Sequence, residues 1–219
     1  VSNNKMKIVL ENIGKRFNKE WIFRNISYEF SAGNKYSILG TNGSGKSTLL
    51  QIIAGSLSQS EGEIKYENSE FSPDGYRDQN PESVFQHLSF ASPYFELPEE
   101  MTWREAVKFH GKFKRFAATD NGQRTTDKVI SLSGLETSSE KQLRNFSSGM
   151  KQRAKLALAI LSDTTLLLLD EPATNLDESA VKWYQHLISE FAKEKLVIVC
   201  SNYNKEEYSF CDKELVLKH

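Results

Sequence analysis

The sequence has little cysteine and gives no sign of a metal or redox centre built on thiols. Two of its 219 residues are cysteine, Cys200 and Cys211, and their separation matches neither a CxxC pair nor a metal-ligand spacing. Cys200 ends the apolar run 196–200, which predicts a buried strand. We therefore expect both cysteines to be reduced thiols with a structural role.

Long apolar runs are also missing. The longest uninterrupted one covers residues 156–161, six residues, whereas a membrane-spanning helix needs about 20. We therefore expect that the chain does not cross a bilayer by itself. No charged leader followed by an apolar stretch opens the sequence, which favours a cytoplasmic protein over a secreted one.

An excess of either charge is missing as well. The 28 Lys and Arg residues and 29 Asp and Glu residues give a formal net charge of -1. This balance argues against a protein that binds nucleic acid over its whole surface, so we expect no nucleic-acid partner. With 38% hydrophobic residues and a mean hydropathy of -0.52, the composition is that of a soluble globular protein. At about 150 residues per domain, the length predicts one large domain or one core with a smaller inserted lobe.

The first forty residues contain short segments rich in β-branched and aromatic side chains, which predict strands. These segments are residues 7–10, 21–23, 26–30 and 36–39. Their short spacing favours antiparallel pairing of the first three. After a glycine-rich turn, the apolar spacing of residues 49–53 predicts a helix that ends at Gly55.

The middle of the chain has a different texture. Residues 69–81 are polar and rich in turn formers, and Thr102 and Glu105 have the spacing of a capping box ahead of an apolar helical pattern. We expect a helical lobe over residues 94–148.

The last third of the chain alternates between helical and strand patterns. It predicts helix 150–161, strand 166–169, helix 178–193 and strand 196–200. This alternation indicates parallel βαβ units.

The sharpest motif follows the predicted strand 36–39. It matches the phosphate-binding pattern G-x-x-x-x-G-K-[ST] and consists of Gly40, Thr41, Asn42, Gly43, Ser44, Gly45, Lys46, Ser47 and Thr48. The glycines let backbone N–H groups turn toward phosphate oxygens, and the following helix adds the positive end of its dipole. We expect Lys46 to reach the β- and γ-phosphates of a nucleotide and Ser47 to hold Mg²⁺ through its hydroxyl.

A second motif ends the predicted strand 166–169 with two adjacent carboxylates, Asp170 and Glu171. Ligands of parallel sheets bind at the C-terminal ends of the strands. Beside a P-loop, Asp170 has the position of a Walker B aspartate that holds Mg²⁺ directly or through water. Glu171 is placed to orient or deprotonate an attacking water.

A third motif begins at Ser147, which lies 23 residues before Asp170. Ser147 can cap the helix that follows, and the N-terminus of that helix is a second anion site. The segment resembles the signature of ABC ATPases, usually Leu-Ser-Gly-Gly-Gln, with Ser147 and Gly149 retained and Phe146, Ser148 and Met150 changed.

Residues 173–177 resemble the D-loop of the same family, with Asp177 in the matching position. The order of these motifs along the whole chain resembles an ABC ATPase nucleotide-binding domain. The resemblance implies an α/β fold: a RecA-like P-loop NTPase core with an N-terminal antiparallel β subdomain and an inserted α-helical subdomain. Within a single domain 1–219, the β lobe and core then cover 1–93 and 149–219, and the helical subdomain covers 94–148 and ends in the signature.

The aromatic residue that stacks on adenine in this family has several candidates here. Phe17 is the best match, with Trp21 and Phe23 as alternatives, because an aromatic residue at such a position is as often part of the core.

Two further family positions are changed. Ser92 occupies the position of the Q-loop glutamine that contacts Mg²⁺, with Gln86 as the alternative if the register differs. Asn202 occupies the position of the switch histidine. Asparagine can hydrogen-bond a γ-phosphate but cannot accept a proton as histidine does. We therefore expect hydrolysis that is retained but slow.

The resemblance implies an ATPase subunit of an ABC transporter that binds ATP and Mg²⁺. In this family two domains dimerise head to tail, so that residues 147–150 of one chain meet the ATP of its partner, which is a second copy or a second ABC ATPase. A separate integral membrane subunit binds on the cytoplasmic face, near residues 92–103. Exposed aromatic residues there, with Tyr94, Phe95 and Trp103 as candidates, compete with a role in the lobe core.

The changes at Ser92 and Asn202 leave a second interpretation open. It is a soluble ABC-type switch that clamps a partner outside the membrane and hydrolyses little ATP. The absence of a long coiled-coil insert and of a second such domain in this chain argues against it.

Overall fold

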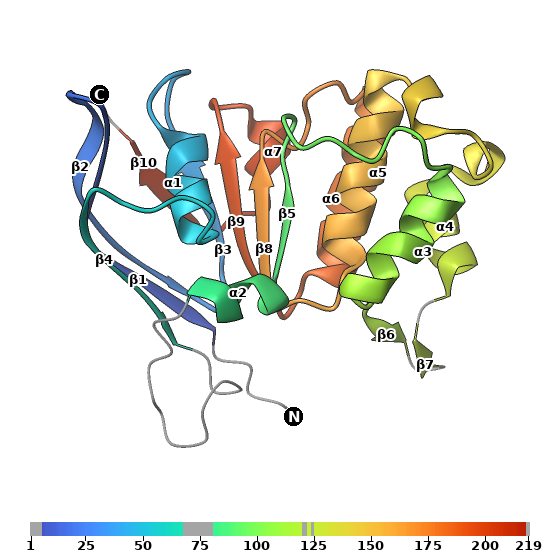
Figure 1. Ribbon diagram of the computed structural model, residues 1–219, viewed down its shortest axis with the longest axis horizontal. Helices are drawn as coiled ribbons and strands as arrows, with labels where there is room; N and C mark the ends of the chain where they lie inside the picture. The colour runs from blue at the N-terminus through green and yellow to red at the C-terminus, as the bar shows by residue number, and fades with distance from the viewer. Residues whose placement is uncertain (1–5, 68–80, 120–121, 124, 218–219) are drawn as a thin grey trace.

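The computed structural model describes residues 6–67, 81–119, 122–123 and 125–217 (Figure 1). Within them, an antiparallel sheet with the strand order β2-β1-β4 lies beside a parallel sheet with the order β10-β3-β9-β8-β5. Helices flank the parallel sheet, and a helical lobe stands at the end of the molecule away from β2 (Figure 1). This arrangement agrees with the α/β fold expected from the sequence.

The antiparallel sheet consists of β1 (Lys7–Phe17), β2 (Glu20–Ser31) and β4 (Glu61–Glu67). The predicted antiparallel pairing is confirmed for β1 and β2. The two predicted segments 21–23 and 26–30 form one strand, because a bulge with Asn25 at a φ of 57° absorbs the break between them. β4, which pairs with the other edge of β1, was not predicted.

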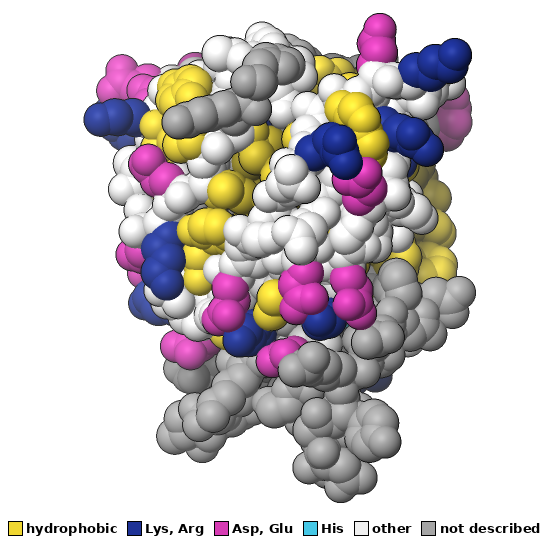
Figure 2. Space-filling model, turned by 90° about the vertical axis from the view of Figure 1, so that its left-hand side faces the viewer, with side chains coloured by type: hydrophobic (Ala, Val, Ile, Leu, Met, Phe, Trp, Pro, Cys, Tyr) yellow, Lys and Arg dark blue, Asp and Glu magenta, His cyan; other side chains and the backbone are white. Residues whose placement is uncertain are grey.

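Acidic and basic side chains mix over the face of the molecule that carries β2 (Figure 2). Ion pairs across the antiparallel sheet join Lys7 to Glu29, Arg24 to Glu61 and Lys65 to Glu11. Exposed pairs of this kind contribute at most about 1 kcal/mol each to stability. The hydrophobic burial beneath the sheet therefore stabilises this part of the fold more than its surface charges do.

The parallel sheet consists of β3 (Lys35–Leu39), β5 (Leu88–Ala91), β8 (Leu166–Asp170), β9 (Leu196–Ser201) and β10 (Lys213–Val216). Every residue of β8 and β9 is buried. Both strands were predicted from their continuous apolar runs, the mark of strands covered on both faces. β5 and β10 were not predicted, since each is only four residues long.

Two hydrophobic clusters cover the two faces of the parallel sheet. Leu166 and Leu168 belong to the cluster that contains the buried residues of α1 (Lys46–Ile53), whereas Leu167 and Leu169 belong to the cluster that contains those of α5 (Ser148–Leu161). The two helices therefore lie on opposite faces of the sheet.

The remaining elements are short or belong to the helical lobe and the C-terminal part. They are α2 (Pro81–His87), α3 (Trp103–Phe113), β6 (Ala118–Thr119), β7 (Gly122–Gln123), α4 (Thr126–Ser133), η1 (Glu136–Ser138), η2 (Leu143–Asn145), α6 (Glu178–Phe191) and α7 (Lys205–Tyr208). The predicted helices begin and end within three residues of α1, α5 and α6. Most of the predicted turn-rich segment 69–81 lies outside the described residues.

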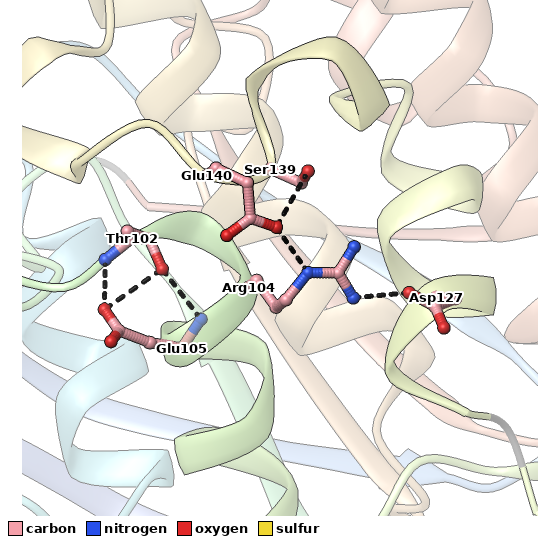
Figure 3. Close-up of polar contacts among 6 residues, drawn as sticks. All are labelled: Thr102, Arg104, Glu105, Asp127, Ser139 and Glu140. Carbon is pink, nitrogen blue, oxygen red and sulfur yellow. Dashed lines mark hydrogen bonds and ion pairs between the residues drawn. The ribbon is translucent and has the colours of Figure 1, made fainter.

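The predicted capping box begins α3. The Thr102 hydroxyl accepts a hydrogen bond from the Glu105 backbone N–H at 3.2 Å, and the Glu105 carboxylate accepts one from the Thr102 backbone N–H at 2.8 Å (Figure 3). Arg104, beside it, pairs with both Glu140 and Asp127 (Figure 3). The start of α3 is thereby joined to α4 and to the segment after η1.

Trp103 lies in the core of the helical lobe, so its candidacy as an exposed docking residue is wrong. Its side chain has no exposed surface, and its indole N–H donates to the Ser133 hydroxyl at 3.2 Å. The indole belongs to the same hydrophobic cluster as Val129 of α4, and burying so large an apolar ring stabilises the lobe. Tyr94 and Phe95 are exposed as expected, at 83% and 58%.

Within the described residues, no helix combines the length and the apolar content that crossing a membrane requires.

Removing the capping hydroxyl should destabilise the lobe. We expect Thr102→Ala to lower the free energy of unfolding by about 1 kcal/mol, because the first turn of α3 loses a side-chain acceptor. Urea unfolding followed by circular dichroism measures the change. Thr137→Ala, at an exposed threonine outside the box, is the control and should change stability by less than about 0.5 kcal/mol. Equal effects of the two substitutions would contradict the role of the box.

Candidate functional site

The glycine-rich loop between β3 and α1 has a backbone that other residues cannot easily adopt. Gly43 and Gly45 have φ values of 84° and 89°, in the left-handed region. A Cβ atom on Gly45 would lie 2.6 Å from Ile22 and 2.7 Å from Phe23. The loop is therefore held closely against β2, which explains why the motif needs glycine there.

Lys46 places its ammonium group inside this loop. Its Nζ donates to the carbonyl oxygens of Gly40 and Thr41 at 2.9 and 3.0 Å, and the residue is only 5% exposed. The first turn of α1 has no acidic residue and no side-chain cap. Its backbone N–H groups and the lysine charge together form a site for an anion such as a phosphate.

Asp170 ends β8 with a buried carboxylate. Its Oδ2 accepts from the Ser92 hydroxyl at 3.4 Å, and its Oδ1 has no hydrogen-bond partner within the described part of the chain. Burial raises the pKa of Asp170, which a hydrogen bond from Ser47 opposes. A buried carboxylate oxygen without a partner, beside two hydroxyl groups, is a donor set that fits Mg²⁺.

Glu171 follows Asp170 in a strained backbone conformation. Its φ is 44°, in the left-handed region that disfavours a side chain. Its N–H donates to the Cys200 carbonyl oxygen at 3.0 Å, which fixes the turn to the end of β9. The strained turn directs the chain away from the sheet immediately after the Asp170 carboxylate.

The structure places the two changed family positions, Ser92 and Asn202, directly after parallel strands. Ser92 follows β5 and lies against Asp170, whereas the alternative residue, Gln86, is exposed in α2. Asn202 is exposed and directly follows β9. Because β5, β8 and β9 are parallel, Ser92, Asp170 and Asn202 lie at the carboxyl ends of neighbouring strands, on the same side of the sheet.

The three aromatic candidates near the loop differ in exposure. Phe23 is buried against Gly45 and belongs to the core. Phe17 is 48% exposed, with the Lys15 ammonium 4.9 Å from its ring centroid. Trp21 is half-buried, and its ring is covered by the guanidinium of Arg24 at 4.2 Å. Phe17 therefore has the free ring surface that stacking on a base requires.

The signature segment begins α5. The Ser147 hydroxyl accepts from the Met150 backbone N–H at 3.2 Å, so the predicted cap is present, and Ser148 is exposed beside it. A Cβ atom on Gly149 would lie 2.9 Å from the Asn175 carbonyl oxygen. The signature therefore packs directly on the D-loop of its own chain.

Asp177 of the D-loop caps α6. Its Oδ1 accepts from the Ala180 backbone N–H at 2.8 Å and from the Ser179 hydroxyl at 2.7 Å. The backbone hydrogen bond from Ala180 lowers the pKa of Asp177. This carboxylate is ionised at neutral pH and fixes the turn between the D-loop and α6.

A groove of about 580 Å³ lies between the parallel sheet and the helical lobe. Its wall is mainly apolar and includes Phe85, Phe95, Phe109 and Phe113, each of which is at least 43% exposed. Lys155, on α5, also lines it and donates to the carbonyl oxygens of Ser92 and Pro93 at 3.3 and 2.8 Å. Sequence reasoning missed Lys155, although it stands on the basic helix after the signature.

His110 lines the same groove, and its ring is held by neighbouring side chains. Its Nε2 is 2.8 Å from the Ser162 hydroxyl, and its ring stacks on Phe116. Burial lowers its pKa to about 4, with the charge of Lys114 acting in the same direction. The ring is therefore neutral at physiological pH.

Comparison with known proteins gives a consistent result. The ABC transporter family matches residues 23–174. The uncharacterized ABC transporter ATP-binding protein YybJ of Bacillus subtilis is 29% identical over 209 residues, which cover 95% of this chain and 91% of that protein. The energy-coupling factor transporter ATP-binding protein EcfA1 of Thermotoga maritima is 34% identical over 184 residues, 78% of this chain and 63% of that protein.

Solved structures share the fold. A dimeric bacterial ABC transporter cassette, MJ0796, has a TM-score of 0.77 at 22% identity and covers 96% of this chain and 94% of its own. A bacterial Atm1-family ABC exporter with ATP bound has a TM-score of 0.79 at 19% identity, with 100% of this chain covering 38% of that one.

The chain belongs to the ABC transporter family. Within that family it is an ATP-binding subunit and an ATPase.

Lys46 should be required for nucleotide binding. We expect Lys46→Ala to weaken ATP binding about 10- to 150-fold, because charge-assisted hydrogen bonds to phosphate contribute about 1.5–3 kcal/mol. Isothermal titration calorimetry measures the dissociation constant. Lys193→Ala removes an exposed lysine that lies two residues after the end of α6 and should leave the dissociation constant unchanged. Tight binding by Lys46→Ala would rule out the loop as the phosphate site.

Proposed function

We propose that this chain drives a membrane transporter by closing and reopening a head-to-tail dimer. ATP binding closes the dimer, Mg²⁺-dependent hydrolysis reopens it, and the motion passes to a separate integral membrane subunit. One observation supports the proposal above all. Within one chain, the parallel sheet separates the two anion sites, which are the N-termini of α1 and α5.

That separation follows from the packing of the two helices. α1, which begins at the P-loop, and α5, which begins at the signature, cover opposite faces of the parallel sheet. Both helix N-termini favour an anion. Since the sheet stands between them, the signature of one chain binds the nucleotide of another, and two copies or two related cassettes complete both sites.

The residues at the edge of the sheet supply the chemistry. Lys46 positions the β- and γ-phosphates, and Ser47, Asp170 and Ser92 hold Mg²⁺. When bound, Mg²⁺ neutralises negative charge on the phosphate oxygens. Glu171 orients and deprotonates the attacking water.

Two residues complete the nucleotide site at its margins. Asn202 donates a hydrogen bond to the γ-phosphate but takes no proton, so hydrolysis is slow. Phe17 stacks on the base through its exposed ring face.

The groove beside Ser92 supports docking of a partner protein, which in this proposal is the membrane subunit. Its exposed phenylalanines form an apolar surface that a helix of the partner covers. Tyr94, which is 83% exposed, directly precedes Phe95 of this surface in the chain. The chain then lies peripherally on the cytoplasmic face of the membrane.

Glu171 should be essential for hydrolysis but not for closure. We expect Glu171→Gln to lower kcat at least about 100-fold, because a general base contributes that much or more. ATP should still dimerise this variant in size-exclusion chromatography. Glu190→Gln changes an exposed glutamate of α6 and is the control, with unchanged kcat. Parent-like hydrolysis by Glu171→Gln would show that another group activates the water.

The groove should be needed for the partner and not for ATP hydrolysis. We expect Phe113→Glu to lower binding to a detergent-solubilised membrane subunit that co-purifies with the parent chain by about 5- to 30-fold, because a buried aromatic contact contributes about 1–2 kcal/mol. Pull-down and steady-state ATPase assays measure the two properties. His186→Glu, on exposed α6 surface outside the groove, is the control. Unchanged binding, or recovery with soluble proteins only, would contradict the transporter proposal.

A further inference from the structure

The peptide group that joins Pro172 to Ala173 is held at both of its polar atoms. The Pro172 carbonyl oxygen accepts from Gln152 Nε2 at 3.0 Å, and the Ala173 N–H donates to Glu207 Oε1 at 3.2 Å. Gln152 and Glu207 are each only 3% exposed. One residue past Glu171, the chain is therefore clamped between α5 and α7.

Glu207 extends this clamp to the end of β9. Its Oε2 accepts from the Ser201 hydroxyl, and Ser201 is the last residue of β9, directly before Asn202. The Glu207 carbonyl oxygen accepts from the Tyr184 hydroxyl at 2.9 Å, which fixes this part of α7 to α6. A single carboxylate thus joins the segment after β8 to the segment after β9.

The clamp stands next to backbone strain. The backbone of Glu171, with its φ of 44°, is strained, and such a conformation persists only where its surroundings enforce it. The bond from its own N–H to Cys200 fixes the peptide before it. The bonds from Gln152 and Glu207 fix the peptide after the next residue, and the strained turn lies between these fixed points.

The position of Glu207 is electrostatically unfavourable. Burial raises its pKa to about 7, and the nearby carboxylates of Glu171 and Asp170 act in the same direction against the hydrogen bonds from Ser201 and Ala173. A buried acid beside two others destabilises the fold unless its hydrogen bonds compensate for the lost hydration. Stability alone therefore does not explain a glutamate at this position, whereas its hydrogen bonds to two segments of the proposed active site do.

We propose that Glu207 is a positioning residue for ATP hydrolysis, which holds Glu171 and the Asn202 segment at a fixed spacing through its bonds to Ala173 and Ser201. This inference rests on the proposed role of Glu171 as the base. In this role Glu207 acts through Ala173 and Ser201 and not on the reacting atoms. It acts on the rate because a displacement of about 1 Å at a reacting group lowers a rate about 100-fold.

The variants Glu207→Ala, Glu207→Gln and Glu206→Ala of the full chain test the proposal. For each one, kcat and the KM for ATP are measured separately. Glu207→Ala removes both bonds and should lower kcat about 10- to 100-fold with KM changed less than about twofold. Glu207→Gln should restore most of the rate. Its carbonyl oxygen accepts from Ala173, and its amide donates to Ser201, whose hydroxyl turns to the Asn204 carbonyl oxygen at 3.3 Å.

Glu206→Ala is the matched control, because Glu206 is the neighbouring glutamate on α7 and is exposed. It should leave kcat and KM at the parent values. Thermal unfolding and ADP affinity show whether each variant is folded. If Glu207→Ala does not fold, Ser201→Ala decides: a lower kcat at unchanged KM supports the proposal, and a parent-like kcat overturns it.

Other outcomes also decide. A folded Glu207→Ala with parent-like kcat, or a Glu207→Gln as slow as Glu207→Ala, overturns positioning by hydrogen bonds. Glu171→Gln separates this inference from the function it rests on. If Glu171→Gln hydrolyses ATP at the parent rate, the assignment of the base fails; if it is inactive while Glu207→Ala is fast, only the role of Glu207 fails.

Discussion

The burial of β8 on both faces is the constraint on which the rest of the structure depends. Its four leucines alternate between two hydrophobic clusters, and each buried side chain of this kind contributes about 1.5–3 kcal/mol. The strand cannot slip by one residue without exchanging the two clusters. Asp170, the next residue, is therefore fixed in position by apolar packing rather than by polar contacts of its own.

The candidate site at the carboxyl ends of the strands is assembled around this fixed strand. β5 and β9 pair with β8 on either side, so Ser92 and Asn202 follow the same edge as Asp170. The antiparallel lobe adds the side chains of Ile22 and Phe23, which press on Gly45 and hold the phosphate loop. Residues that are distant in the sequence thus lie close together, because the short hydrophobic strands that precede them run in the same direction.

Local motifs were the part of this protein that the sequence predicted well. The glycine-rich loop between a strand and a helix, the adjacent carboxylates at the end of β8 and the cap at Ser147 each depend on neighbouring residues, and the local structure of each is as expected. Short strands such as β5 depend on distant partners and were missed, and for the same reason the sequence left open whether Trp103 docks a partner or belongs to the lobe core. Glu207 was invisible for the same reason, because its acceptor role involves Ala173 and Ser201, which only the folded chain brings to it.

The single helix α5 connects the signature segment to the wall of the groove. It begins at the signature, and about 10 Å further along, at a rise of about 1.5 Å per residue, Lys155 grips the backbone beside Ser92 and the groove. A rod does not bend between these points. In the proposed dimer, the phosphate of a neighbouring chain's nucleotide contacts the first turn of α5. If this contact tilts the helix, the groove wall at Lys155 moves with it as part of the same rigid body. The motion then reaches the partner without a chain of separate side-chain rearrangements.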